Sequence, residues 1–559
     1  MVRVDKRLHD WHEPVTPRPA ATLLLLRDTP DGPEILMTRR SLRASFAPGA
    51  WVFPGGVVER EDQLAIRRGL TTSRGDQSDE LLPFGVAALR EAFEELGVLL
   101  AHGMADSQEL ARLIREMDRT HPDHFLDQLE DAGLRLALDQ LFWLSHWVTD
   151  RDLPKRFDTC FFMARMPEHQ RPEADRKEQF EPVWINPARG LELHEQGQFN
   201  IIFPTIRTLR RLAKFRDTEE ILAHTQAQQK IVVSCPRAGW VGGQLQRFSE
   251  EELPFGELEL VSPDGRAEHH LDWQSERVVP LLRQVARLTA PNPGPMTGPG
   301  TNTYFIGAPG NWFVIDPGPA DSGHIERILE HVGTGLKAII CTHGHPDHVP
   351  AAWSLQQKTG APVLGRSSGP NFRREWAFRP DRQLEDGERL RTGDSTLRIL
   401  HTPGHAEHHV CLLLEEDGLL FSGDHILCGS TTVISPPDGD MLAYIRSLER
   451  LAHEPFEFIL PAHGHVMSRG KDEVARLIAH RLQREEKVMA ALLATGGGTL
   501  DDLVPLAYDD VDPIIYPIAK SSLLAHLLKL RDEDRAQEAD SQRWELTAGE
   551  QKGPGPASH

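Results

Sequence analysis

The segment Cys341–Val349 reads Cys-Thr-His-Gly-His-Pro-Asp-His-Val and holds four potential metal ligands in six residues. Neutral imidazole nitrogen suits zinc, and a carboxylate supplies an anionic oxygen ligand. The apolar run Leu336–Cys341 comes just before these ligands, so we expect a buried strand that ends in a ligand-bearing loop. A histidine-rich surface loop is the alternative interpretation. The four candidate ligands are His343, His345, Asp347 and His348.

Three further residues of the same types follow along the chain. They are His405 in His-Thr-Pro-Gly-His, Asp424 in Phe-Ser-Gly-Asp-His and His463 in Leu-Pro-Ala-His-Gly. The seven residues together resemble the ligand set of the metallo-β-lactamase superfamily, which opens with His-x-His-x-Asp-His. Ala462 stands where that family usually has glycine.

This resemblance implies two zinc ions. His343, His345 and His405 would hold one ion, and three other residues the second, with Asp424 bridging both; those three are Asp347, His348 and His463. Two metals about 3.5–4 Å apart can share a hydroxide as nucleophile and stabilise the oxygens of the transition state. Asp347 is also expected to be catalytic. Four nearby histidines are expected to lie outside the ligand set: His408, His409, His425 and His465.

A second set of carboxylates lies on a helix predicted over residues 84–98 and closed by Gly97. Glu91, Glu94 and Glu95 are spaced i, i+3, i+4, so they share one face. The opposite, core-facing stripe consists of Ala88, Leu89, Ala92, Phe93 and Leu96. Carboxylate oxygens are the ligands that Mg²⁺ or Mn²⁺ prefers, so this face is a candidate site for phosphate chemistry.

The helix and the Phe-Pro-Gly-Gly turn before it resemble the Nudix box. The matching positions are Gly55, Gly56, Asp62, Arg90, Glu91, Glu94, Glu95 and Gly97. Asp62 replaces the usual glutamate, and the insert 63–83 is expected to be an external loop. Such an insert is similar to a branch that includes coenzyme A and acyl-CoA diphosphatases. The resemblance implies that Glu94 and Glu95 are the main Mg²⁺ or Mn²⁺ ligands, while Glu91 is a ligand or activates water.

Glu178 and Glu181 are weaker candidates for an additional base in this half of the chain. The alternative interpretation is that both are exposed surface residues without a catalytic role.

Composition places the chain among multidomain globular proteins. It has 559 residues, 39% hydrophobic residues and a formal net charge of −21. The charge argues against long-range attraction to nucleic acid. Five cysteines without paired spacing suggest a reducing compartment, and no apolar run reaches membrane-helix length. We therefore expect a cytoplasmic protein without a membrane partner.

The expected fold is α/β and α+β multidomain. A Nudix α/β/α sandwich is expected over residues 1–225, a linker over 226–280 and an αββα metallo-β-lactamase sandwich over 281–485. Predicted helices at 499–506 and 518–530 and a strand at 543–547 resemble the winged helix of endoribonuclease-type lactamase-B-like proteins, over 486–548. Residues 549–559 are expected to be a disordered tail.

These features predict a tandem metallohydrolase. The zinc site would hydrolyse either a thioester, as in glyoxalase II-like members, or a phosphodiester such as single-stranded RNA. The Nudix site would hydrolyse a diphosphate linkage in a CoA-like or nucleoside diphosphate compound. Two alternatives stay open: the Nudix half is a non-catalytic ligand-binding module, or both halves are ligand sensors. The sequence does not predict the oligomeric state.

Overall fold

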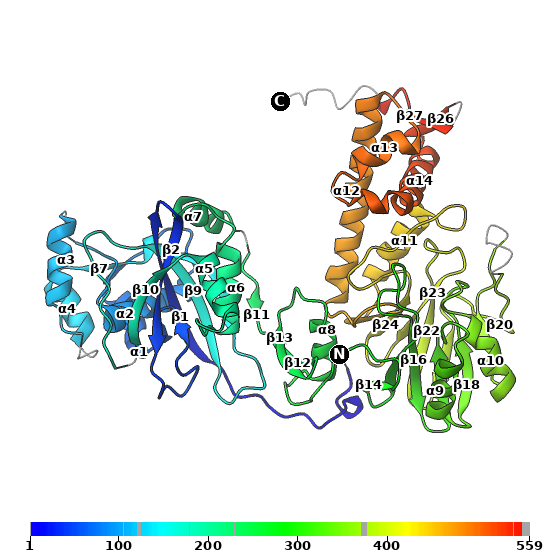
Figure 1. The fold of residues 1–559 in the computed structure, drawn as a ribbon, viewed down its shortest axis with the longest axis horizontal. Helices are drawn as coiled ribbons and strands as arrows, with labels where there is room; N and C mark the ends of the chain where they lie inside the picture. Colours follow the sequence, from blue (N-terminus) through cyan, green and yellow to red (C-terminus); the bar gives the residue numbers. More distant parts are fainter. Residues whose placement is uncertain are drawn as a thin grey trace. The chain divides into compact units, whose positions relative to one another are not determined.

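The computed structural model describes residues 2–103, 106–119, 124–177, 179–228, 230–369, 377–539 and 542–550. The chain forms two compact units, which are drawn in Figure 1. One unit comprises residues 13–238, and the other comprises residues 1–12 together with 239–559. The sequence-based boundaries assigned residues 1–12 to the Nudix domain and residues 226–280 to a linker. In the structure, residues 1–12 and 239–280 belong to the second unit, and residues 226–238 belong to the unit 13–238.

The unit 13–238 is built on one mixed sheet with the order β10-β2-β1-β9-β8-β11, to which β3 and β4 add at β2 and β1. The strands are β1 (Arg18–Thr29), β2 (Gly32–Arg40), β3 (Trp51–Val52), β4 (Gly55–Val57), β8 (Phe142–Val148), β9 (Phe157–Arg165), β10 (Gln179–Ile185) and β11 (Val233–Ser234). Thr29 pairs with Gly32 across the turn of the β1–β2 hairpin. β1 and β9 run parallel.

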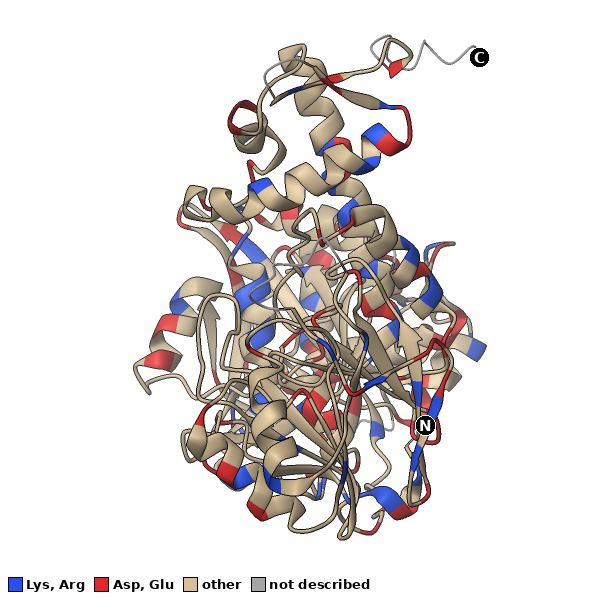
Figure 2. Ribbon diagram, turned by 90° about the vertical axis from the view of Figure 1, so that its right-hand side faces the viewer, with Lys and Arg blue, Asp and Glu red and all other residues tan. Residues whose placement is uncertain are grey.

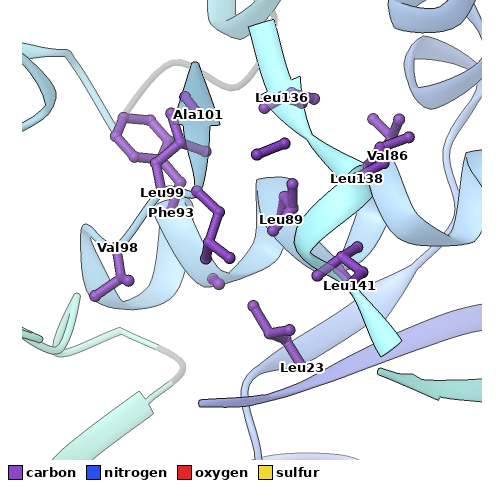
Figure 3. Packing of buried hydrophobic residues seen from close by; sticks show 14 of the residues in the cluster. Leu23, Val86, Leu89, Phe93, Val98, Leu99, Ala101, Leu136, Leu138 and Leu141 are labelled. Carbon is purple, nitrogen blue, oxygen red and sulfur yellow. The ribbon is translucent and has the colours of Figure 1, made fainter. Parts of the chain in front are cut away.

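Helices cover both faces of this sheet. They are α2 (Leu82–Leu96), α5 (Pro187–Glu195), α6 (Phe203–Leu212) and α7 (Thr218–Gln226). Successive side chains of a strand point to opposite faces, so Leu23 and Leu25 of β1 join the core formed with α2. Leu24 and Leu26 join the core on the other face, with residues of α6 and α7. Figure 3 shows Leu23 below Leu89 of α2. The expected α/β/α sandwich is confirmed.

The insert 63–83 is structured, so its prediction as an external loop was wrong. It contains most of α1 (Arg60–Arg67), then β5 (Thr71–Thr72) and a short 3-10 helix, Asp79–Leu81. β5 pairs in parallel with β7 (Arg135–Ala137), which also pairs with β6 (Ala101–His102). Ala65 and Leu70 are buried in the same core as α2. Burial of these few apolar side chains stabilises a folded structure in a segment whose polar composition had indicated a loop. Two further helices of this unit are α3 (Ser107–Glu116) and α4 (Phe125–Asp131).

The second unit contains two sheets packed face to face. The first has the order β14-β15-β16-β17-β18-β19-β20, and the second has the order β21-β22-β23-β24-β25. Their bounds are β14 (Val279–Leu282), β15 (Val285–Thr289), β16 (Asn302–Ala308), β17 (Asn311–Ile315), β18 (Leu336–Ile340), β19 (Val363–Gly365), β20 (Arg382–Gln383), β21 (Arg389–Thr392), β22 (Ser395–His401), β23 (Val410–Leu414), β24 (Leu419–Gly423) and β25 (Phe458–Pro461). Residues of both sheets share one buried core.

Helices cover the outer faces of these sheets. They are α9 (Ser322–Val332), α10 (Pro350–Thr359), α11 (Met441–Ala452) and the first part of α12 (Gly470–Thr495). α9 and α10 share a core with the first sheet, and α11 and α12 share one with the second. The predicted αββα sandwich is confirmed. The strands β22, β24 and β25 run in the same direction, so the loops after them, which carry three candidate ligands, leave one edge of the sheet.

The N-terminal segment packs on the second unit. Arg3 forms a bidentate ion pair with Asp417, with its Nη2 2.7 Å from Oδ2 and its Nε 3.0 Å from Oδ1. His9 Nε2 lies 2.7 Å from Asp264 Oδ1. Because the chain leaves this unit after residue 12 and returns at residue 239, the other unit is inserted between two parts of it.

The stretch before β14 is also structured. β12 (Arg237–Val241) and β13 (Gln244–Phe248) form a hairpin, and α8 (Phe255–Val261) follows. Leu260 and Val261 of α8 are part of the core between the two sheets.

A small module follows the sandwich. It is built from the end of α12, α13 (Leu500–Ala507), the short Pro513–Ile515 3-10 helix, α14 (Tyr516–Asp532) and the hairpin of β26 (Ala536–Ala539) and β27 (Arg543–Leu546). Thr499 begins α13 through a capping box with Asp502. The predicted helices and strand are confirmed. Most of the expected disordered tail, residues 551–559, lies outside the described residues. In the described part of the chain, no helix has both the length and the apolar character that a membrane crossing needs.

Candidate metal centre

Four ligand atoms converge at the end of β18. His343 Nε2 lies 2.9 Å from His345 Nδ1, and His345 Nδ1 lies 3.1 Å from His405 Nε2. Asp424 Oδ2 lies 4.0 Å from His343 Nε2 and 3.7 Å from His405 Nε2. Ligands bonded to one tetrahedral zinc at 2.0–2.1 Å lie about 3.3 Å apart. The four atoms are therefore close enough together to bind a single metal ion.

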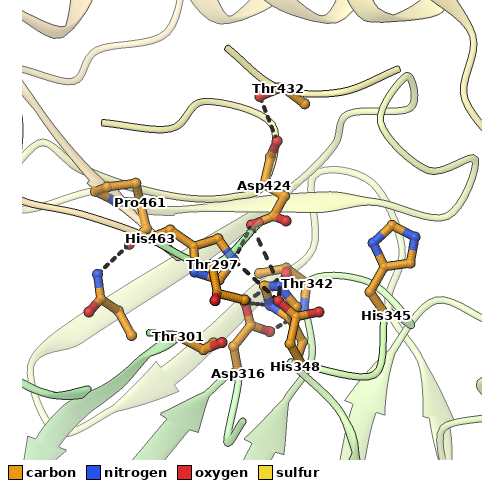
Figure 4. Close-up of polar contacts among 12 residues, drawn as sticks. Thr297, Thr301, Asp316, Thr342, His345, His348, Asp424, Thr432, Pro461 and His463 are labelled. Carbon is orange, nitrogen blue, oxygen red and sulfur yellow. Dashed lines mark hydrogen bonds and ion pairs between the residues drawn. The ribbon is translucent and has the colours of Figure 1, made fainter. Parts of the chain in front are cut away.

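A second group of ligand atoms lies beside the first and shares Asp424. Asp347 Oδ2 lies 3.3 Å from both His348 Nε2 and His463 Nε2. Asp424 Oδ1 lies 3.5 Å from His348 Nε2 and 3.3 Å from His463 Nε2. Figure 4 shows the Asp424 carboxylate between His463 and His348, with His345 to one side. One oxygen of Asp424 therefore faces each group, as a bridging ligand would. All seven residues that the sequence assigned to the zinc site fall in these two groups.

The chemistry of the donor atoms fits a metal. His348 Nε2, His463 Nε2 and Asp424 Oδ1 are buried and have no hydrogen-bond partner. Leaving such atoms unsatisfied costs about 1–3 kcal/mol each. A divalent cation between them would satisfy all three at once.

Hydrogen bonds on the far side of the imidazoles fix which nitrogen faces the centre. Asp316 Oδ2 lies 3.0 Å from His348 Nδ1, and its carboxylate also accepts from the backbone N–H of Thr342 at 2.8 Å. The carbonyl of Gly300 lies 3.1 Å from Nδ1 of His463. Such partners orient metal-binding histidines and select the tautomer.

Asp316 was not assigned to the site from the sequence. It lies in the Asp-Pro-Gly turn after the apolar strand β17, and its backbone φ is 47°. The signal in the sequence that could have identified it is a lone carboxylate directly after an apolar strand; the left-handed backbone, which side chains rarely adopt, is seen only in the structure.

The neighbouring histidines lie around the ligands. His409 Nε2 accepts from the backbone N–H of Asp424 at 3.2 Å, and His408 Nε2 accepts from that of Gly344 at 2.8 Å. His425 packs against the ring of Tyr444. Among the described residues, none of the four belongs to the two ligand groups, as the sequence predicted.

Burial and charge separate the pKa values of the imidazoles. Burial holds the pKa of His343 well below its ordinary value and lowers that of His345 to about 3. Burial also acts to lower the pKa of His463, but the carboxylates of Asp424 and Asp347 raise it to about 10. A lowered pKa keeps the imidazoles of His343 and His345 neutral, which is the form that binds metal. In the second group, the carboxylates that stabilise a charged imidazole would attract a divalent cation equally.

In the other unit, Arg90 organises the glutamates of α2. Its guanidinium binds Asp62 through Nε at 2.9 Å and Nη2 at 3.2 Å, and Nη1 lies 2.9 Å from Glu91 Oε1 and 3.3 Å from Glu94 Oε2. Asp62 is buried, and its Oδ2 also accepts from the backbone N–H of Glu59 at 2.7 Å. Asp62 therefore anchors Arg90 although it is shorter than the glutamate of the family pattern.

The glutamates themselves differ in environment. Glu95 accepts from the backbone N–H of Gly55 at 3.1 Å and from Gln179 Nε2 at 2.8 Å, whereas Glu94 Oε1 is buried without a hydrogen-bond partner. Burial raises the pKa of Glu94 to about 7 and that of Glu95 to about 8. A β-carbon on Gly56 would lie 2.3 Å from Glu91 Oε1, so any larger residue there would displace the Glu91 carboxylate.

These glutamates do not form a compact cluster of ligand atoms like the one around Asp424. Within the described ranges, the groups whose ligand atoms all lie within 4.8 Å of one another are the two that share Asp424. Glu181 is exposed and lies 3.6 Å from Arg39, and Glu178 lies outside the described residues. The glycine turn, Arg90 and the three glutamates are brought together at one end of α2, but the glutamates are held by protein partners.

Comparison with family models identifies three regions. Residues 296–463 match the metallo-beta-lactamase superfamily, residues 499–544 match the beta-lactamase associated winged helix domain, and residues 64–212 match the NUDT19 Nudix domain. The expected Nudix domain, metallo-β-lactamase fold and C-terminal winged helix are thereby confirmed.

Curated relatives match about half of the chain. "Beta-lactamase-like protein 2 homolog" of Drosophila melanogaster is 30% identical over 273 residues, which are 46% of this chain and 91% of the relative. "Lactamase-like protein aptB" of Emericella nidulans is 30% identical, covering 46% and 84%. "Atrochrysone carboxyl ACP thioesterase" of Aspergillus chevalieri is 32% identical, covering 40% and 73%.

Solved structures with similar folds include a metallo-beta-lactamase family protein from Thermus thermophilus and a NUDIX hydrolase from Alicyclobacillus acidocaldarius. The first is 24% identical with a TM-score of 0.41 and covers 48% of this chain and all of that one. The second is 28% identical with a TM-score of 0.32 and covers 37% and 96%. On the family models and the curated relatives, the chain belongs to the metallo-β-lactamase superfamily and carries a Nudix domain and a lactamase-associated winged helix in addition.

Proposed function

We propose that this hydrolase has a dinuclear zinc centre that cleaves thioesters. The observation that carries the proposal is the placement of the two Asp424 oxygens, one toward each ligand group. His343, His345 and His405 would hold one ion, and Asp424 would bridge to the second, which three further residues would hold: Asp347, His348 and His463. When bound, two such ions polarise the scissile carbonyl and lower the pKa of water to near neutrality.

The chain's own residues would supply positioning and proton transfer. Asp316 holds His348, and the Gly300 carbonyl holds His463, so both imidazoles present Nε2 to the centre. Asp347 is the more exposed of the two carboxylates, and its side chain is 25% accessible. An accessible carboxylate next to the nucleophile can accept a proton from the attacking water, so we assign Asp347 that role in addition to metal binding.

The thioester class is supported by a relative. The Aspergillus chevalieri protein, which is named as an acyl carrier protein thioesterase, aligns with 40% of this chain at 32% identity. A Nudix domain of the CoA-diphosphatase type in the same chain points to the same substrate class, because an acyl-CoA contains both a thioester and a diphosphate. We therefore propose acyl-CoA-like thioesters as substrates of the zinc centre.

RNA is the weaker candidate substrate because most Lys and Arg side chains in the described part of the winged-helix module form ion pairs. Lys487 lies 2.6 Å from Asp509, Arg484 lies 2.8 Å from Asp510, and a further pair joins Lys529 to a buried glutamate of α12. Figure 2 shows acidic and basic positions interspersed along these helices. Phosphate binding depends on unpaired Lys and Arg, so the module is better suited to packing than to nucleic acid.

For the Nudix domain we propose Mg²⁺- or Mn²⁺-dependent cleavage of a diphosphate linkage in a CoA-like compound. The unpaired buried oxygen of Glu94 supports a metal there, with Glu95 and Glu91 as further ligands and Glu91 also activating water. A non-catalytic ligand-binding domain is the alternative, because Arg90 and Gln179 already hold these glutamates.

All five cysteines are free thiols, which supports the proposed cytoplasmic location.

The test supplies zinc- and magnesium-loaded protein with acyl-CoA thioesters of different chain lengths, CoA and single-stranded RNA, and identifies the products by mass spectrometry. We expect free thiol from acyl-CoA in the wild type and in Glu94→Ala but not in Asp424→Ala. We expect phosphopantetheine products to disappear only in Glu94→Ala. RNA cleavage that requires Asp424, without thiol release from any thioester, would overturn the thioester proposal.

A further inference from the structure

A buried cluster of charged side chains lies directly beneath the loop that carries His463. Its centre is Glu257 of α8, which is fully buried. Glu257 Oε2 lies 2.6 Å from Arg287 Nη1, and Oε1 lies 3.0 Å from Arg287 Nη2 and 2.7 Å from His269 Nε2. A carboxylate is excluded from an interior of this kind unless it is paired and hydrogen-bonded, so each of these partners is needed.

The same carboxylate contacts the metal-binding loop. Glu257 Oε2 lies 3.2 Å from His465 Nδ1 and accepts from the backbone N–H of Val466 at 3.5 Å. The loop starts after β25, and His463 lies two residues before His465. Glu257 therefore binds the loop through one side chain and one backbone group just beyond the candidate ligand.

Two further contacts fix α8 and its neighbours against this loop. A β-carbon on Gly256 would lie 2.4 Å from the backbone nitrogen of Ser468 and 2.5 Å from the carbonyl oxygen of Val466, so the backbones are in direct contact. The ring of Trp273 packs against that of His465 with 4.4 Å between centroids, and the Arg287 guanidinium lies 4.9 Å from the same indole. The loop is thus clamped by the segment 255–273, which the sequence indicated only as a linker.

We propose that Glu257 is a positioning residue for the second metal site, acting through His465 and the Val466 N–H on the placement of His463. The inference rests on the proposed dinuclear centre. His463 Nε2 must stay near two carboxylates, 3.3 Å from Asp347 Oδ2 and 3.3 Å from Asp424 Oδ1, to share a cation with them. Its Nδ1 contacts the Gly300 carbonyl, and Asn302 holds the backbone on either side by donating to the carbonyls of Ala462 and Gly464. From the next residue, His465, the loop is held by Glu257. Removing the negative charge leaves Arg287 without its ionic partner and weakens the contacts that Glu257 makes with His465 and the Val466 N–H.

The test uses Glu257→Gln, which keeps the size and removes the charge. In the full chain loaded with Zn²⁺, the affinity of each ion is measured by competition with a chelator, and the Co²⁺-substituted protein is examined by its visible absorption. We expect the affinity of the second ion to fall about 10–100-fold, as for other residues that support metal ligands, with little change for the first. The Co²⁺ spectrum should change only in the bands of the weaker site.

Glu485→Gln is the matched control. Glu485 is a buried glutamate of α12 that lies 2.8 Å from Lys529 Nζ in the winged-helix module, and it contacts no part of the ligand loop in the described structure. The Glu485→Gln variant should lose thermal stability, as Glu257→Gln does, but it should bind both ions like the wild type. His465→Gln, which removes the intermediate contact at less risk to folding, should reproduce the weakened second site.

The outcomes separate the inference from the proposed function. A wild type that binds fewer than two ions contradicts the dinuclear centre itself. A two-ion wild type, with a second-ion affinity in Glu257→Gln no lower than in Glu485→Gln, overturns the role of Glu257. If Glu257→Gln does not fold, His465→Gln decides: wild-type affinity for the second ion overturns the inference, and a weakened second site supports it.

Discussion

Asp424 and His463 lie on neighbouring strand ends, with Asp424 Oδ1 3.3 Å from His463 Nε2, while the other oxygen of Asp424 lies 3.7 Å from His405 Nε2. The parallel pairing of β24 and β25 brings the two residues together, although 38 positions separate the strands' ends in Gly423 and Pro461. Sheet topology thus places one carboxylate between two groups of imidazoles.

Asp424→Asn should abolish the carboxylate bridge, although the asparagine side chain has nearly the same volume as the aspartate that it replaces. The amide carries no charge, and its nitrogen would point a donor at one of the two ligand groups. We expect kcat/KM for thioester cleavage to fall at least about 100-fold, with loss of one or both ions. Metal analysis alongside kinetics checks this, and an Asn variant with full activity and two ions would contradict the bridging role.

Asp316→Asn should weaken metal binding, although Asp316 is not one of the candidate ligands. The carboxylate holds both the Thr342 backbone N–H and His348 Nδ1, and an amide can replace only part of that set. We expect metal affinity to fall about 10–100-fold while the fold is retained. Chelator competition measures the affinity. Unchanged affinity would mean that the hydrogen bond to His348 has no part in orienting it.

Arg3→Ala should destabilise the second unit. Asp417 is fully buried, and Gln284 would remain as its neutral partner when Arg3 is removed. Leaving a buried carboxylate without its cation should cost about 1–3 kcal/mol, since Arg3 itself is partly exposed. Calorimetry should show a lower melting temperature for the transition of this unit, whereas the transition of residues 13–238 should not move. A shift of both transitions would show that the effect is not local.

Acid should remove a specific part of the second unit's stability. Burial acts to raise the pKa of Glu257, but Arg287 and His269 hold it well below its ordinary value. A depressed folded-state pKa stabilises the fold above the unfolded-state value of about 4.3, and this stabilisation is lost as the pH falls through the folded-state pKa. Denaturant unfolding should therefore show a stability gap between wild type and Glu257→Gln that is constant above about pH 5 and shrinks below it. A gap that grows toward acid pH would reverse the sign and refute this.

Gly56→Ala should disable the Nudix site alone. The added β-carbon would meet the Glu91 carboxylate at 2.3 Å, so that glutamate must move away from Arg90. We expect diphosphate cleavage to fall at least about tenfold while thioester cleavage at the zinc centre is unchanged. Product analysis on one acyl-CoA substrate reads both activities. Full diphosphate cleavage in this variant would show that the position of Glu91 does not matter.

Local spacing was sufficient to predict the candidate ligands, because each motif follows an apolar strand and ligand types are recognisable one by one. The helix α2 was predictable for the same reason, from its periodicity and from Gly97, whose φ of 67° ends it. Contacts between residues far apart in the sequence could not be predicted in this way. Nothing near Glu257 in sequence indicates His465, which is 208 positions away, and nothing near Arg3 indicates Asp417. The insert 63–83 was misjudged because two buried apolar residues, Ala65 and Leu70, outweigh its polar majority.

The number of metal ions bound per chain tests the dinuclear centre most directly. Purified wild type and Asp424→Ala are loaded with Zn²⁺, freed of excess metal and measured by elemental analysis and native mass spectrometry. Two tightly bound ions in the wild type, and none or one in Asp424→Ala, are the predicted result. A wild type that retains one ion or none, or an Asp424→Ala variant that still retains two, would contradict a centre bridged by this carboxylate.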